Sequence, residues 1–137
     1  MWKIYALLSA LFAALTAILA KVGVKGINGN VATAIRTIVV LIMAWGIVFL
    51  SGQLKNVKEL SKTNLLFLIF SGLATGLSWI FYFKALETGD VSKVAPIDKL
   101  SVVFVMILSF FFLKESMDIK TIIGGALIAI GAVVLVV

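Results

Sequence analysis

Residues 65–83 read LLFLIFSGLATGLSWIFYF, an apolar stretch without a single charged side chain. A helix needs about 20 such residues to cross the hydrocarbon core of a bilayer, because each residue advances it by about 1.5 Å. Similar stretches lie on both sides of it, and together they predict five membrane-spanning helices, at residues 4–20, 31–50, 65–83, 91–113 and 119–137. These spans occupy nearly the whole chain, so we expect one all-α integral membrane domain over residues 1–137.

The composition excludes several classes of function. Hydrophobic residues make up 63% of the chain and charged residues 13%, whereas about a quarter of the residues in soluble domains are charged. Cysteine and histidine are absent, which argues against disulfides, metal sites and Ser-His or Cys-His catalysis. No glycine-rich phosphate-binding loop is present. We therefore expect no enzyme, metal, cofactor or nucleic-acid partner, and instead membrane lipids and a small-molecule substrate as partners.

The basic residues are distributed almost evenly between the two sides of the membrane. Five alternating spans place six of them on the side of the N-terminus: Lys3, Lys55, Lys58, Lys62, Lys114 and Lys120. The other side also receives six, or four if the two inside spans are left out: Lys21, Lys25, Arg36, Lys84, Lys93 and Lys99. Lysine and arginine in short loops orient membrane proteins, so this balance predicts either insertion in both directions or a small preference for the N-terminus inside.

Insertion in both directions would allow two copies to pair antiparallel. The pair would be related by a two-fold axis in the membrane plane, which is the architecture of transporters with inverted repeats. The sequence therefore predicts an antiparallel homodimer of ten helices if both orientations coexist.

Three stretches carry a resemblance to a known family. They are LTAILAKVGVKGINGNVATAIRT (15–37), GLSWIFYFKALETGDVSKVAPIDKLSVVFVMILSFFFLKE (76–115) and IIGGALIAIGAVVLV (122–136). They resemble the EamA-like family of the drug/metabolite transporter superfamily, and residues 79–115 are the most specific part. Many members have two five-helix repeats of inverted orientation, so the resemblance implies that this chain is one repeat and that two copies form a transporter. We expect a multi-pass protein of a bacterial or archaeal cell membrane.

Charged residues inside two spans are the first candidates for a substrate or coupling site. Arg36 and Asp98 each lie about five to seven residues inside a span, and both spans start on the same side. A charge at that depth is costly unless it is paired. We therefore expect Asp98 to face inward and pair with Arg36 or a nearby lysine, and to serve as a proton-coupling residue, while Lys99 points elsewhere. The alternatives are a purely structural ion pair for Arg36 and Asp98 and a snorkelling side chain for Lys99.

Polar and aromatic residues of the third span are further candidates. Trp79 and Tyr82 are three residues apart and therefore share a helical face, which predicts either aromatic walls of a substrate site or an interfacial belt. Small polar residues complete the set of candidates: Thr16 in the first span and Thr75 and Ser78 in the third.

Small residues predict where helices approach one another closely. Such glycines occur in the third and fifth spans: Gly72, Gly76, Gly124, Gly125 and Gly131. In the fourth span Pro96 lies near the helix start, where its missing N–H is tolerated, and the alternative is a functional kink.

The most concrete function that the sequence predicts is secondary transport of a small metabolite by alternating access. Arg36 and Lys99 favour an anionic or zwitterionic molecule, such as an amino acid. Two alternatives remain, half of a heteromeric transporter or flippase for an amphipathic or lipid-linked substrate, and a membrane subunit that assembles other proteins without transporting.

Overall fold

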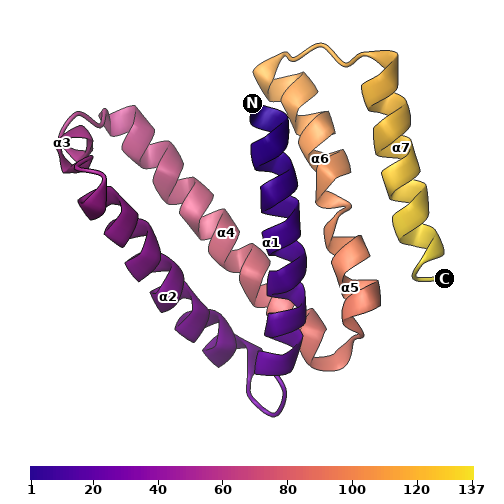
Figure 1. Ribbon diagram of the computed structural model, residues 1–137. Coiled ribbons are helices and arrows are strands. Elements are labelled where there is room, and N and C mark those ends of the chain that lie inside the picture. Colours follow the sequence, from indigo (N-terminus) through magenta and orange to yellow (C-terminus); the bar gives the residue numbers. More distant parts are fainter. The chain divides into compact units, whose positions relative to one another are not determined.

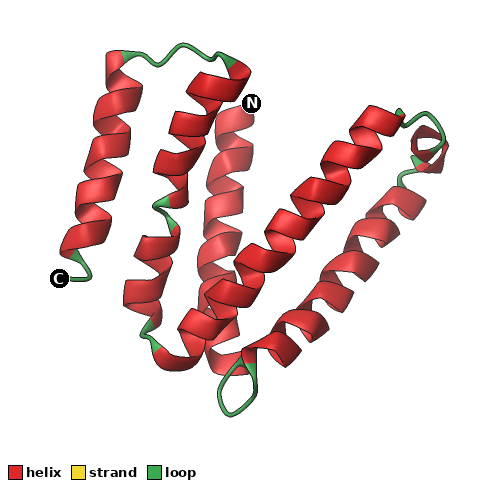
Figure 2. Ribbon diagram, turned by 180° about the vertical axis from the view of Figure 1, so that it is seen from behind, coloured by secondary structure: helices red, strands yellow, loops and turns green.

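A computed structural model describes residues 1–137, and every regular element in it is a helix (Figure 1). Figure 2 shows the same chain from behind, with helices joined by loops and no strand. The elements are α1 (Trp2–Gly23), α2 (Gly29–Leu50), α3 (Leu54–Val57), α4 (Lys62–Thr88), α5 (Val91–Asp98), α6 (Ser101–Leu108), the π-helical turn η1 (Ser109–Leu113) and α7 (Ile119–Val134). The predicted all-α class is confirmed.

Four segments are long and apolar enough to cross a membrane. They are Trp2–Gly23, Gly29–Leu50, Lys62–Thr88 and Val91–Leu113. The fifth apolar helix, α7, has 16 residues, or roughly 24 Å at 1.5 Å per residue, against a hydrocarbon core of about 30 Å. It is shorter than the predicted span 119–137 because the chain tightens after Val134, where the N–H of Val136 donates to the carbonyl of Val133 at 3.0 Å.

The chain divides into two compact units. One unit comprises Leu19–Thr88 and is called the α2–α4 unit below. The other comprises Met1–Ile18 together with Gly89–Val137 and is called the α5–α7 unit. The first part of α1 belongs to the α5–α7 unit and its end to the α2–α4 unit, and each unit is described by itself.

Within the α2–α4 unit, α2 and α4 run antiparallel and pack where α2 begins and α4 ends (Figure 1). The buried side chains of the unit lie at that end: Ala20, Val24, Ala32, Thr33, Phe83 and Leu86. Leu86 is the only large side chain with no exposed surface. Toward α3 the side chains of both helices are exposed, as expected for surfaces that meet lipid or another protein.

Within the α5–α7 unit, the fourth predicted span is not one continuous helix. It breaks between α5 and α6, where the N–H of Leu100 donates to Ile97 at 2.9 Å and that of Val102 to Lys99 at 3.0 Å (Figure 1). These are i to i−3 bonds of the tighter 3₁₀ type. Pro96 lies in the second turn of α5, where it has no N–H for the carbonyl of Ser92. The expectation of a tolerated proline at the helix start is therefore wrong.

The helix α7 is held by a cap and a close contact. The carboxylate of Asp118 accepts a hydrogen bond from the backbone N–H of Thr121 at 2.9 Å, which makes Asp118 the N-cap of α7. Further along, a Cβ at Gly125 would lie 2.6 Å from the sulfur of Met106 on α6. The lack of a side chain at Gly125 thus gives Met106 its place between the helices.

Candidate substrate site

Arg36 lies inside a membrane span with its guanidinium against aromatic rings. It is seven residues after Gly29, the first residue of α2, which is roughly 10 Å along the helix. The guanidinium carbon is 4.4 Å from the centre of the Trp79 ring and 5.5 Å from that of Phe83, both on α4. Such cation–π contacts stabilise a charge that the bilayer would otherwise disfavour.

No carboxylate of the α2–α4 unit pairs with Arg36. The unit holds two acidic residues, Glu59 and Glu87, and neither forms an ion pair with it. The guanidinium carries five N–H donors, which lie in its plane. These donors make no hydrogen bond within the unit and can bind a carboxylate or phosphate group in a bidentate manner.

Two hydrogen bonds tie the end of α4 to the start of α2 and to α1, and two more order the start of α2 itself. The backbone N–H of Gly29 donates to the carboxylate of Glu87, and the ammonium of Lys21 donates to the carbonyl of Leu86 at 2.7 Å. On α2 itself, the Asn28 side chain accepts from the N–H of Asn30 at 2.8 Å, and the Thr33 hydroxyl donates to the carbonyl of Gly29 at 2.8 Å. We call the Gly29–Glu87 and Lys21–Leu86 contacts the clasp, which positions Arg36 over its aromatic partners.

Gly29 is required at this point because the two helices nearly touch. A Cβ on it would lie 2.7 Å from Oε1 of Glu87 and 3.2 Å from the backbone carbonyl carbon of Phe83. The sequence analysis did not identify Phe83 or Glu87 as part of a site. Their spacing was a usable signal, since Trp79, Phe83 and Glu87 follow one another every four residues and therefore share one face of a helix.

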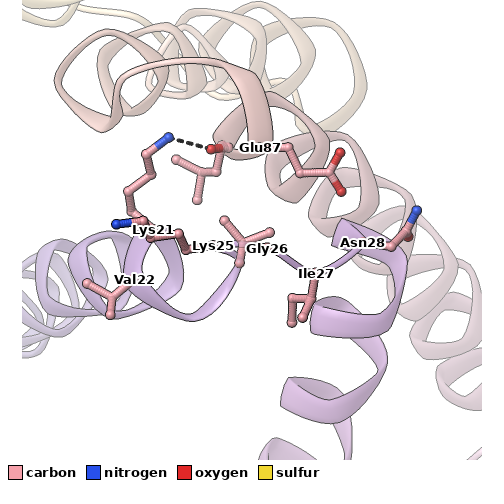
Figure 3. A pocket seen from close by; sticks show the side chains of 9 residues that line it. Lys21, Val22, Lys25, Gly26, Ile27, Asn28 and Glu87 are labelled. Carbon is pink, nitrogen blue, oxygen red and sulfur yellow. Dashed lines mark hydrogen bonds between the residues drawn. The ribbon is translucent and has the colours of Figure 1, made fainter.

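A cavity of about 660 Å³ lies beside the clasp, at the turn between α1 and α2 (Figure 3). Polar residues from three segments line it: Lys21 and Lys25 from the end of α1 and the turn after it, Asn28 at the start of α2, and Glu87 from the end of α4. The remaining lining residues are Val22, Val24, Gly26, Ile27 and Leu86. This cavity thus lies at the end of α2 nearest to Arg36.

The remaining predicted site residues are dispersed. The hydroxyl of Thr75 donates to the carbonyl of Ser71 on its own helix at 2.9 Å, and Ser78 lies on the same helix. Thr16, Asp98 and Lys99 belong to the α5–α7 unit. There the ammonium of Lys99 pairs with the Asp98 carboxylate at 3.3 Å, with the two side chains 57% and 37% exposed. The expectation that Lys99 points away from Asp98 is therefore wrong, because the two charges meet at the helix break.

The predicted packing glycines also differ from one another. Gly125 contacts Met106, as described above. The others have no neighbour within 4 Å of a Cβ placed on them: Gly72, Gly76, Gly124 and Gly131. No other helix of the same unit packs against these four glycines.

Comparison with known proteins decides the family. The chain matches the EamA-like transporter family over residues 1–137. It belongs to the EamA-like transporter family. It is also 51% identical, over 136 residues, to a protein of Sinorhizobium sp. described as "Uncharacterized transporter in cobO 3'region". That match covers 99% of this chain and 96% of the relative. No solved structure matches the chain.

Membership of the EamA-like family confirms the resemblance seen in the sequence. Together with the long apolar helices, it establishes a multi-pass membrane protein of a transporter family. In this EamA-like chain, Arg36, Trp79 and Tyr82 are the predicted site residues that one unit brings together.

Proposed function

We propose that this EamA-like protein carries a small anionic or zwitterionic metabolite, such as an amino acid, across the membrane by alternating access in an antiparallel homodimer. The observation that carries the proposal is Arg36, a cation inside a span that rests on the Trp79 and Phe83 rings with no carboxylate partner in its unit. Charged residues inside spans generally face a cavity or a partner and mark substrate pathways.

The chemistry around Arg36 favours a negatively charged group over a cation. The guanidinium stays protonated under all physiological conditions and repels a cationic ligand. Its in-plane donors match the two oxygens of a carboxylate, and the aromatic rings of Trp79 and Tyr82 supply an apolar wall for the rest of a small molecule. The guanidinium of Arg36 would neutralise the charge of a carboxylate bound there while the substrate crosses the membrane.

Three observations support pairing with an inverted second copy. The two sides of the membrane carry nearly equal numbers of basic residues, which favours insertion in both directions. The Sinorhizobium relative is matched over 96% of its length, so the two proteins are of similar length. Gly72 and Gly76 on α4 leave room for a second backbone. Two inverted copies would place the site near the bilayer midplane between them.

Uptake into proteoliposomes tests the role of Arg36. We expect the wild-type protein to transport members of a panel of radiolabelled amino acids and small organic acids. Arg36→Lys keeps the charge but loses the flat, bidentate donor set, so it should retain only a small part of the uptake, and Arg36→Gln should retain none. Lys84→Gln, which removes an exposed cation from α4, is the matched control and should transport normally. Normal uptake by Arg36→Gln would refute the proposal.

Labelling of a single cysteine tests the antiparallel pair. The chain has no cysteine, so Asn56→Cys in the α3 segment provides a unique thiol for a membrane-impermeant maleimide. If both orientations coexist, about half of the protein should label in intact cells and all of it after permeabilisation. Labelling from one side only would contradict the homodimer and favour a heteromer with a partner of opposite orientation.

A further inference from the structure

In the cavity at the turn between α1 and α2, the basic and acidic lining residues lie on different sides. In Figure 3, Lys21 and Lys25 lie on one side of it and Glu87 and Asn28 on the other. Lys21 is held in place by its hydrogen bond to the carbonyl of Leu86 at 2.7 Å. Lys25 lines the cavity and forms no ion pair or hydrogen bond through its ammonium. One wall of the cavity therefore carries two lysine side chains.

The single carboxylate of the cavity does not cancel these charges. Glu87 accepts the backbone N–H of Gly29, so part of its charge is already engaged by the start of α2. Two ammonium groups against one carboxylate leave a net charge of +1 on the lining residues (2 − 1). A concave surface of one sign concentrates ions of the opposite sign at its mouth.

The cavity lies at the end of α2 that is nearest to Arg36. Gly29, beside the cavity, and Arg36 are on the same helix, about two turns or roughly 10 Å apart. For an anionic group bound at Lys25, Arg36 is therefore the next cation along α2.

We propose that this cavity is an anion-accepting vestibule, in which Lys25 and Lys21 bind the carboxylate or phosphate group of a small metabolite before it reaches Arg36. Its part in transport rests on the proposed function, whereas the anion site itself stands on the cavity and its charges. Lys25 is the specificity-determining residue of this site, and Lys21 is fixed by α4 as its second cation.

The charge of the vestibule can be measured without knowing the substrate. Ile27→Cys places a thiol in the cavity lining, and its reaction rates with two methanethiosulfonate reagents are compared, one with a sulfonate and one with a trimethylammonium tail. Ser116→Cys is the control, because the nearby charges of its exposed turn, residues 114–120, balance. Protein in phosphatidylcholine nanodiscs exposes both membrane faces to the reagents.

We expect the ratio of sulfonate to trimethylammonium rates to be about 10-fold higher at Ile27→Cys than at Ser116→Cys. Adding Lys25→Gln should remove most of this preference. Inorganic phosphate should slow the reaction of Ile27→Cys with the sulfonate reagent. Val22→Cys serves as a second reporter in case Ile27→Cys disturbs the turn. Equal ratios at the cavity reporters and at Ser116→Cys would overturn the proposal.

The source of the anion is tested by changing the lipid. If the site serves free metabolites, adding phosphatidylglycerol to the nanodiscs should leave the rates at Ile27→Cys unchanged. Strong protection by phosphatidylglycerol would assign the site to a lipid headgroup and overturn the vestibule.

Uptake measurements separate the two proposals. An anion preference at Ile27→Cys without any uptake of anionic or zwitterionic solutes would refute the proposed function and leave the anion site standing. Uptake that depends on Arg36, with no anion preference at the cavity, would refute only the vestibule.

Discussion

Gly29→Ala should loosen the start of α2 from the end of α4. The added Cβ would lie 2.7 Å from the Glu87 carboxylate oxygen and 3.2 Å from the backbone carbonyl carbon of Phe83. The Glu87 side chain can rotate away, but the backbone of α4 can move only with its helix. We therefore expect the two helices to separate locally and the hydrogen bond from Gly29 to be lost.

The size of the effect follows from the two losses. Overpacking of a close contact costs about 1–3 kcal/mol. A hydrogen bond to a charged group contributes about 1.5–3 kcal/mol, which we reduce to about 1 kcal/mol because the Glu87 side chain is solvent-exposed. Alanine regains up to about 1 kcal/mol from its higher helix propensity. The net loss in free energy of unfolding should be about 1–3 kcal/mol.

Gly46→Ala is the matched control, because Gly46 is in the same helix but has nothing within 4 Å of a Cβ. This variant should be as stable as the wild type or slightly more stable. Equilibrium unfolding in mixed micelles by a denaturing detergent, followed by far-UV circular dichroism, measures both changes. Glu87→Gln completes a double-mutant cycle with Gly29→Ala, and the combined loss should be smaller than the sum. Wild-type stability of Gly29→Ala, or an equal loss in Gly46→Ala, would refute the reasoning.

Three further predictions concern the α5–α7 unit. Asp98→Asn removes the partner of Lys99 at the helix break and should lower both uptake and assembly; normal uptake and expression would contradict a coupling role. Hydrogen bonds from the hydroxyl and N–H of Thr121 lower the pKa of the Asp118 carboxyl. A lowered folded-state pKa means that the cap stabilises α7 above the ordinary aspartate pKa and loses this effect as the pH falls through the lowered value. Hydrogen exchange of the first α7 amides should therefore accelerate only in strong acid in the wild type, and already at neutral pH in Asp118→Ala. Gly125→Leu should displace Met106 and destabilise the unit by about 1–3 kcal/mol, whereas Gly124→Leu, with open space around it, should not; equal unfolding curves would contradict this.

Several features of the candidate site were accessible from the sequence. Arg36 was predicted because a charge inside an apolar stretch is costly wherever the helix points. Trp79 and Tyr82 were predicted from their spacing of three residues, and the Trp79 ring contacts Arg36. Phe83 was not predicted, since an aromatic residue near the end of a span is most often in contact with lipid.

The clasp could not be predicted in the same way. Gly29 and Glu87 both lie outside the predicted spans, in the connections that follow residues 20 and 83. Their contact depends on how closely α2 approaches α4 and how each helix is rotated. The break in the fourth span was only the alternative prediction, because a tolerated proline near the helix start was preferred to a kink, whereas α5 begins at Val91 and has Pro96 in its second turn.

By itself, the sequence determined that the chain lies in a membrane, that it is helical, and roughly where the apolar helices are. These features depend on hydrophobicity, helix rise and hydrogen bonds between neighbouring residues, all of which are local. Only the tertiary structure decided that Arg36 lies on Trp79 and Phe83, that Gly29 meets Glu87, and that a cavity with two lysines opens beside them. Those contacts join residues more than 40 positions apart, and they exist only because packing sets the rotation and separation of α2 and α4.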